Sequence, residues 1–240
     1  MKKQFLMVWA LICLFACFAG VLADDAVISF EVIDNFKEES KHFFADYDTI
    51  SVSGMGDEAE QDDLNNYLKA EAEMFIEQYY EDVEYEKTAW PEETEEIGPV
   101  FGGTFHAAGV TDTDEYYVFM TEYGYQGASW SSIREFFTFD KADGALLSLT
   151  DIIGDSDEAF ESLVDYVRGK MEEYNAENPE EVGYWLEDDS LDIAMEALDD
   201  NGHWYIDSDG NLLVIFDKYE VAPGAFGPSD FVIPAEVYAD

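Results

Sequence analysis

The amino-acid sequence predicts an α+β fold in which an antiparallel sheet with hairpins packs against two main helices. Segments with helical spacing of apolar residues occur together with strands that short turn signals join into hairpins, and this order is typical of the α+β class. The chain has 240 residues, of which 48% are hydrophobic and 16% aromatic. Although 56 acidic side chains face only 11 basic ones, a formal charge of −45, this composition indicates a folded acidic protein and not a disordered acidic tail.

The N-terminus has the pattern of a secretory signal peptide over residues 1–23. Lys2 and Lys3 precede an apolar run, which ends at the small residue Ala23 and is followed by Asp24 and Asp25. A basic start, an apolar segment and a small residue at the cleavage site define such a peptide. A single uncleaved anchor is the alternative, because about 19 apolar residues can just cross a bilayer.

The two cysteines, Cys13 and Cys17, both lie inside this segment. Cleavage after Ala23 therefore leaves a chain without thiols or disulfides, whose stability comes from its core alone. Residues 14–17 also resemble a bacterial lipobox, in which Cys17 would be acylated and become the new N-terminus. Phe15 is bulky for that motif, and Cys17 is the residue that separates the two kinds of processing.

The part from residue 24 to 114 is expected to contain strands, one long helix and a further strand. Residues 26–33 and 41–53 are rich in β-branched and aromatic residues with partial alternation, which predicts two strands. The next segment has one apolar stripe at helical spacing, and acidic residues at 57–63 suit its N-terminus. The stripe comprises Leu64, Leu68, Ala72, Phe75, Ile76, Tyr79 and Val83. Residues 84–96 are acidic and contain Trp90-Pro91, which predicts a loop.

Three strands are predicted at residues 100–110, 115–125 and 132–140, separated by turns at 111–114 and 124–131. A further hairpin signal at 141–144 precedes residues 145–149. Asp155 with Glu158 forms a capping-box pattern for the second main helix, and Ser190 can cap a short helix that reaches Leu198. The second helix should bury Phe160, Leu163, Val164, Val167, Met171 and Tyr174. A terminal hairpin follows at 204–207 and 212–217 around Asp209-Gly210.

The sequence contains no recognisable catalytic or metal-binding motif. His42, His106 and His203 are scattered without ligand spacing, which favours surface or half-buried strand positions over metal ligands;. The acidic loops at 207–211 and 155–158 lack the glycine and glutamate positions of an EF-hand, so we interpret them as a hairpin turn and a helix cap. Weak surface binding of calcium through charge density stays open. We therefore expect no enzymatic activity, no cofactor and no metal centre.

Aromatic residues are the candidate binding residues. Tyr123, Tyr125 and Trp130 cluster around a glycine-rich turn, and Tyr184 and Trp185 lie in an acidic loop. Exposed rings can stack on sugars or anchor a protein partner, but rings at strand ends also commonly close a core.

The chain from about residue 115 to its end resembles a bacterial extracytoplasmic domain family, found at the C-terminus of the lysozyme-sensing anti-sigma factor RsiV and beside some peptidoglycan deacetylases. The resemblance is carried by a strand, a Tyr-Glu-aliphatic-Ala-Pro segment, a glycine and a last strand ending in Ile-Pro. These stretches are residues 209–216, 219–223, Gly227 and 232–234, and the hairpin from 137 to 153 also fits. The family's tyrosine turn is present at 123–130, with Trp130 where relatives carry histidine.

This resemblance implies an exported, non-enzymatic sensor or binding domain of the cell envelope, in which residues 24–114 and 115–240 pack as one composite unit. Without residues 1–23 the charge is 9 − 56 = −47, which disfavours nucleic acid and anionic membranes as partners and favours a cationic protein such as a lysozyme-like enzyme. A cell-wall glycan, stacked on Tyr123, Tyr125, Trp130 and Trp185, is the alternative ligand. An anti-sigma role is not expected, because only residues 1–4 precede the apolar run.

Overall fold

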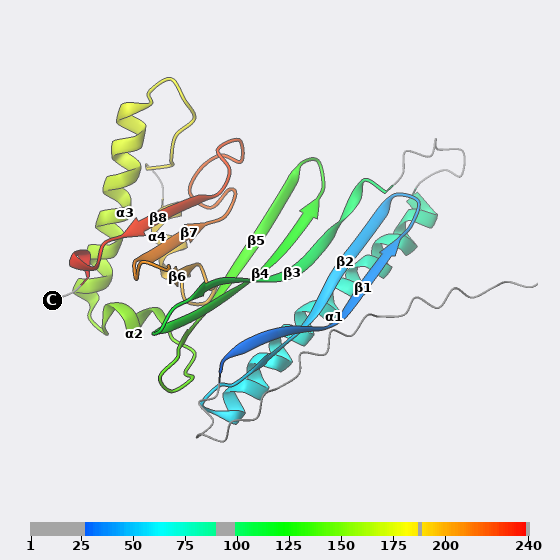
Figure 1. The fold of residues 1–240 in the computed structure, drawn as a ribbon. Coiled ribbons are helices and arrows are strands. Elements are labelled where there is room, and N and C mark those ends of the chain that lie inside the picture. The colour runs from blue at the N-terminus through cyan, green and yellow to red at the C-terminus, as the bar shows by residue number, and fades with distance from the viewer. Residues whose placement is uncertain (1–26, 90–98, 187–188, 239–240) are drawn as a thin grey trace, which may run out of the picture.

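In the computed structural model two β-sheets lie between a long helix on one side and a group of helices on the other (Figure 1). The structure describes residues 27–89, 99–186 and 189–238. The strands are β1 Ser29–Glu39, β2 Phe43–Ser53, β3 Phe101–Asp112, β4 Tyr116–Gln126, β5 Trp130–Asp140, β6 Trp204–Ile206, β7 Leu212–Phe216 and β8 Ser229–Ile233. The helices are α1 Glu58–Ala89, α2 Leu149–Ile153, α3 Asp157–Glu177 and α4 Ser190–Glu196, with a 3-10 turn, η1, at Ala235–Val237.

The large sheet has five strands in the order β1-β2-β3-β4-β5. Neighbours are antiparallel except β2 and β3, which run parallel. A parallel pair needs a crossover connection, and α1 supplies it. Asp57 caps this helix by accepting a hydrogen bond from the Ala59 amide at 2.7 Å. Asn65, about two turns further on, pairs with both backbone groups of Val52 in β2 and fixes the first part of α1 against the sheet;.

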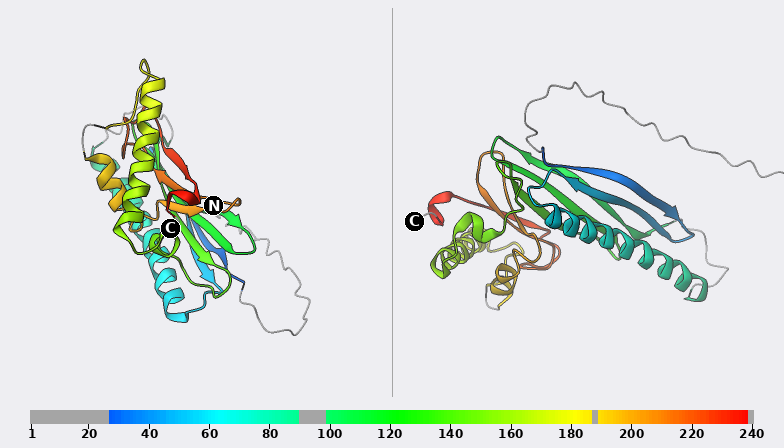
Figure 2. Two further views of the ribbon diagram at one scale, coloured as in Figure 1. Left: turned by 90° about the vertical axis from the view of Figure 1, so that its left-hand side faces the viewer. Right: turned by 90° about the horizontal axis from the view of Figure 1, so that it is seen from below.

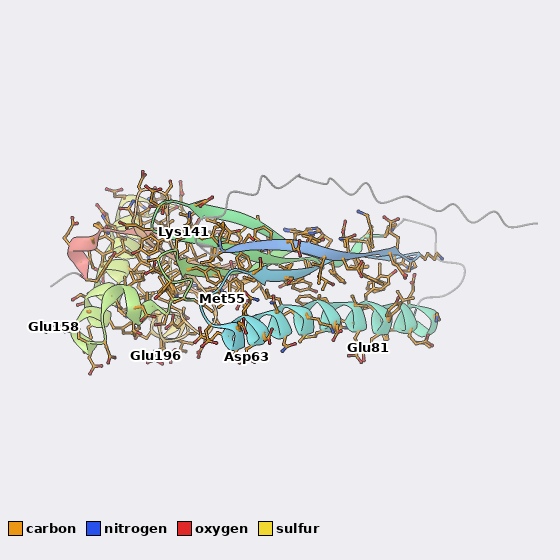
Figure 3. All side chains as sticks on the ribbon, turned by 60° about the horizontal axis from the view of Figure 1, so that its bottom comes forward. Met55, Asp63, Glu81, Lys141, Glu158 and Glu196 are labelled. Carbon is orange, nitrogen blue, oxygen red and sulfur yellow. The ribbon has the colours of Figure 1, made fainter. Side chains whose placement is uncertain are left out.

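The first core lies between α1 and one face of the large sheet, where side chains fill the space between the two layers (Figure 3). The helix contributes buried residues three to four positions apart, as the sequence predicts;. They are Leu64, Leu68, Ala72, Phe75 and Tyr79. The sheet contributes mainly aromatic residues, among them Phe105, Phe119, Phe137 and Phe139.

The small sheet, in the order β6-β7-β8, joins the two sides of the molecule. All five residues of β7 are buried. Leu213 and Ile215 pack against Val118 and Phe136 on the second face of the large sheet. The alternate residues of β7 point the other way, into a core shared with α3 and α4;. Figure 2 shows α3 beyond the small sheet, at the opposite end of the molecule from α1.

The α+β class is confirmed, but the arrangement of strands differs from the expectation of an antiparallel sheet. Two sheets form instead of one, and the large sheet contains a parallel pair. The short strand β7 explains the division, because an uninterrupted apolar run is suited to burial on both faces and therefore to a layer between two others.

The loop predicted at residues 84–96 is wrong for residues 84–89, which continue α1. Glu86 explains the extension, since it is buried and its carboxylate lies 2.5 Å from the ring of His42. This contact gives the last helical turns a polar anchor in place of an apolar one. Residues 90–98, with Trp90-Pro91, lie outside the described residues.

Two helix starts also differ from the prediction. Ser156, and not Asp155, caps α3 by accepting a hydrogen bond from the Ala159 amide. The capping box lies earlier, between Ser148 and Asp151, and begins the short helix α2. The expected hairpin partner at residues 145–149 is reduced to a single bridge between Leu146 and Phe139. The predicted signal peptide, with Cys13 and Cys17, lies outside the described residues. Within 27–89, 99–186 and 189–238, no helix combines the length and apolar character that crossing a bilayer requires.

Candidate binding surface

The three aromatic residues of the tyrosine turn lie on two different faces of the β4–β5 hairpin. Tyr123 and Tyr125 alternate with Phe119 along β4 and so share the face that carries α1;. Trp130 pairs with Gln126 and lies on the other face, where its ring covers Gly124. The hairpin therefore presents two tyrosines on one side and a tryptophan, 46% exposed, on the other.

Tyr184 and Trp185 are not part of this cluster, because they lie beside the small sheet. The Tyr184 hydroxyl contacts the Ser229 hydroxyl at 3.2 Å, and its ring packs between Tyr174, Phe226 and Phe231. The Trp185 amide donates to the carbonyl of Val221. In this structure Tyr184 closes the core beneath α3.

Tyr123 and Tyr125 help to form a hollow of about 350 Å³ between the end of α1 and strands β2, β3 and β4, which we call the aromatic cavity. Its wall is lined by Phe43, Tyr47, Gln78, Asp82, Tyr85, Phe101, Gly102, Tyr123, Tyr125 and Gln126. Tyr123 stacks on Phe75 with ring centroids 3.9 Å apart and is followed by Tyr125 at 5.8 Å. The tyrosine turn therefore contributes one wall of a cavity whose other residues come from distant segments.

A second hollow of about 430 Å³, the acidic cavity, lies along the outer edge of β5, and Tyr125 lines both hollows. It is bounded by α1, by β5, and by the segments before β6 and after β7. The lining residues are Tyr67, Glu71, Tyr125, Ser131, Ser132, Ile133, Glu135, Asp200, Asn201, His203, Asp217, Lys218 and Glu220. Five carboxyl groups thus face one lysine and one histidine, so the potential in this hollow favours cations.

Among the acidic groups of this cavity, the carboxyl of Glu135 has the pKa that is shifted furthest from its usual value. Burial raises the pKa of its carboxyl to about 7, and the nearby Glu71 adds to the rise. The Tyr67 hydroxyl donates a hydrogen bond to Glu135 at 2.9 Å, which opposes the shift without cancelling it. Burial also raises the pKa of Glu71. The cavity therefore holds a carboxyl group that can gain or lose a proton near neutral pH.

The wall of the acidic cavity behind β5 is held by a charge network. The Arg134 guanidinium lies 2.9 Å from Asp217, whose other oxygen accepts a hydrogen bond from the Arg134 amide. His203 is 3.6 Å from Asp217 and 3.4 Å from Glu220. Burial raises the pKa of the Glu220 carboxyl, although the nearby His203 opposes this. These contacts tie β5 to the turn after β7 and fix the shape of the cavity.

The histidines differ from the expected surface or half-buried positions in two of three cases. His42 is 1% exposed and His203 is 3% exposed, whereas His106 is exposed and lies 2.9 Å from Asp48. Both buried rings lie against carboxyl groups, which a scan for ligand spacing does not detect. No group of three or more histidine, cysteine or acidic side chains in the described ranges is arranged to hold a metal ion.

In the acidic loop at residues 207–211, the Asp207 side chain stabilises the turn itself. One Asp207 oxygen accepts hydrogen bonds from the amides of Asp209 and Asn211. This agrees with the interpretation as a hairpin turn, which links β6 to β7.

Asp82, Gln78 and Tyr47 are the cavity residues that sequence reasoning missed. The first two lie on α1 one helical turn apart, and Tyr47 lies in β2. The pattern of apolar and polar residues around them predicts a helix and a strand, but it does not indicate that they line a cavity. The parallel pairing of β2 with β3 brings them to the tyrosine turn, and that pairing was not predicted.

Together these features define a class: an α+β domain that combines a small buried sheet with two ligand-sized hollows beside a long helix. Residues 150–236 match the family described as a protein of unknown function, DUF3298. The chain is 24% identical over 205 residues to the anti-sigma-V factor RsiV of Bacillus subtilis strain 168, a match that spans 85% of this chain and 67% of that protein.

Two solved structures of DUF3298 proteins are similar. One, from Bacteroides fragilis NCTC 9343, has a TM-score of 0.55 and 18% identity, over 88% of this chain and 92% of that one. The other, from Pseudomonas aeruginosa PAO1, has a TM-score of 0.49 and 15% identity, over 89% and 93%. The B. fragilis protein shares the fold. Residues 150–236 are thus similar to the DUF3298 family, and the chain is similar to RsiV over most of its length.

Proposed function

We propose that this protein is an exported, non-enzymatic domain of the sensor type that binds a cationic protein outside the cytoplasm. The observation that carries the proposal is the pair of hollows that adjoin at Tyr125, one lined with rings and one with carboxyl groups. A partner that covers Tyr125 would reach both. Tyrosine side chains packed in pockets near the centre commonly contribute most of the binding energy of a protein–protein interface.

The overall charge supports the same kind of partner. A formal charge of −45 accelerates the encounter with a basic protein and disfavours acidic competitors;. The similarity to the anti-sigma-V factor RsiV supports a sensor-type role, and the family resemblance favours a lysozyme-like enzyme as the partner. The signal-peptide pattern at residues 1–23 supports export.

The test is calorimetric titration of the mature protein with a basic lysozyme. We expect a complex of defined stoichiometry that weakens with salt but persists at about 0.15 M, where charges more than about 8 Å apart are screened. Tyr125→Ala should weaken binding at least about tenfold, as expected for the loss of an aromatic anchor. Tyr80→Ala is the matched control, because Tyr80 is also an exposed tyrosine and lines neither cavity. Absence of a complex at low salt, or equal effects of both variants, would contradict the proposal.

The alternative function is that of an accessory domain bound to cell-wall glycan. It is favoured by Trp130, a residue that is 46% exposed on the face of the β4–β5 hairpin away from α1 and can stack on a sugar;. Under this alternative, Trp130→Ala abolishes co-sedimentation with purified peptidoglycan while lysozyme titration stays unchanged. Unchanged co-sedimentation would exclude it.

A further inference from the structure

The Tyr47 hydroxyl is a polar group at the wall of the aromatic cavity. Tyr47 is 3% exposed and lines the cavity, and its hydroxyl forms no hydrogen bond with any residue that the structure describes. The hydroxyl lies over Gly103, where a Cβ atom would be 3.1 Å from it and 2.9 Å from the ring of Tyr123. Because this hydroxyl lies at the cavity wall, a ligand in the cavity can donate a hydrogen bond to it or accept one from it;.

The carboxylate of Asp82 is the second polar group of this cavity. It accepts one hydrogen bond, from Gln78 at 3.1 Å, and pairs with no cation among the described residues. No lysine or arginine is among the residues that line the cavity. Asp82 lies close enough to the hydroxyls of Tyr47 and Tyr123 to raise the pKa of both groups, after the larger effect of burial. The cavity thus offers a charged acceptor and two hydroxyls to the same ligand.

The rings decide which kind of ligand fits. Tyr123 has Phe75 stacked on one side and Tyr125 on the other, and Tyr47 stacks with Phe36, so these rings offer little free face to a neutral sugar. Tyr125 and Tyr85, which are 38% and 63% exposed, present surface at the opening. A flat cation can stack on such rings at the entrance while its N–H groups donate to a carboxylate inside.

We propose that the aromatic cavity binds the guanidinium group of an arginine side chain from the partner protein. Asp82 accepts hydrogen bonds from the guanidinium, the Tyr47 hydroxyl accepts another, and Tyr85 and Tyr125 stack on the plane of the cation. Arginine is favoured over lysine because its planar fork of five donors matches several acceptors at once, whereas an ammonium is compact and strongly hydrated. This inference rests on the proposed function for the identity of the partner as a protein.

The direct experiment is a titration of the mature protein with N-acetyl-arginine amide, followed by amide chemical shifts, with N-acetyl-lysine amide and chitotriose as comparison probes. Shifts should be centred on Tyr47, Asp82 and Tyr125, and the arginine probe should bind at least about threefold more tightly than the lysine probe. Asp82→Asn should weaken arginine binding about tenfold. Asp165→Asn, an equal change of charge on α3, should change it less than about twofold.

Tyr47→Phe is the variant that separates the hydroxyl from the ring. It keeps the packing, so its melting temperature should match that of the wild type, while the affinity for the arginine probe falls about threefold or more. Equal losses for Asp82→Asn and Asp165→Asn would overturn the inference, as would tighter binding of chitotriose than of the arginine probe, or shifts confined to other surfaces.

The same variants distinguish this inference from the proposed function. If lysozyme binds and Asp82→Asn leaves its affinity unchanged, the arginine site is wrong and the proposed function stands. If the arginine probe binds at the cavity and no lysozyme complex forms, the site stands and the proposed partner is wrong. If both hold, Asp82→Asn should weaken the lysozyme complex by a similar factor.

Discussion

Replacement of Glu135 by glutamine should stabilise the protein at pH 8, and only about a quarter of this gain should remain at pH 5;. Burial raises the pKa of the Glu135 carboxyl from a usual 4.5 to about 7 in the folded protein. Between these two values the folded state holds a proton that the unfolded state has released, so the free energy of unfolding falls as the pH rises through this window. Glutamine has no such proton, and its amide oxygen can still accept the hydrogen bond from Tyr67.

The size of the effect follows from the shift. An interval from 4.5 to about 7 corresponds to about 3 kcal/mol at about 1.4 kcal/mol per pH unit;. Because the carboxyl lies at a cavity that is open to solvent, screening reduces this value, and we expect Glu135→Gln to gain about 1–3 kcal/mol at pH 8. The gain should shrink progressively between pH 8 and pH 5.

Urea unfolding at pH 5, 6, 7 and 8 measures the difference, provided that the slope with urea concentration is the same for both proteins. Glu161→Gln is the control, since this exposed acid on α3 removes one negative charge without touching the cavity. A pH-independent difference for Glu135→Gln, or a profile equal to that of Glu161→Gln, would refute the assignment of a neutral-range titration to Glu135.

Three further changes test the packing. Arg134→Met should lower the free energy of unfolding by about 3–5 kcal/mol, because the buried Asp217 carboxylate would lose its cation; a loss below about 1 kcal/mol in urea titration would contradict this. Leu163→Ala, at a fully buried position of α3, should cost about 2–5 kcal/mol by calorimetry, and a smaller loss would mean that the α3 core is loosely packed;. Gly124→Ala would place a Cβ atom 2.1 Å from the Trp130 ring and should expel it, costing about 1–3 kcal/mol and shifting tryptophan fluorescence to the red; an unchanged spectrum would show that the ring does not cover Gly124;.

Much of the fold follows from periodicity in the sequence. The stripe from Leu64 to Tyr79 predicts α1 and its buried face, because each residue contributes to one apolar side of a helix. The strands β3, β4 and β5 agree with the predicted ranges to within about two residues, a usual margin for element ends;. Local patterns suffice where one element buries one face.

What the sequence did not reveal depends on contacts between distant segments. Glu86 extends α1 because His42, 44 positions earlier, faces it. The aromatic cavity depends on the parallel pairing of β2 with β3, which places Tyr47 beside Tyr123. Of the five predicted aromatic binding residues, Tyr123 and Tyr125 line a common cavity, whereas Trp130 lies on the opposite face and Tyr184 and Trp185 lie beside the small sheet.

The five buried residues of β7 link the family segment to the rest of the chain. The DUF3298 match begins at residue 150, yet Leu213 and Ile215 within it pack against Val118 and Phe136, which precede it. A polypeptide that began at the start of the match would expose Leu213 and Ile215 of its central strand to solvent. Such a polypeptide would tend to self-associate through these side chains. In the intact protein, amide protons of β7 should be among the last to exchange with deuterium, since freeing them requires both halves to separate.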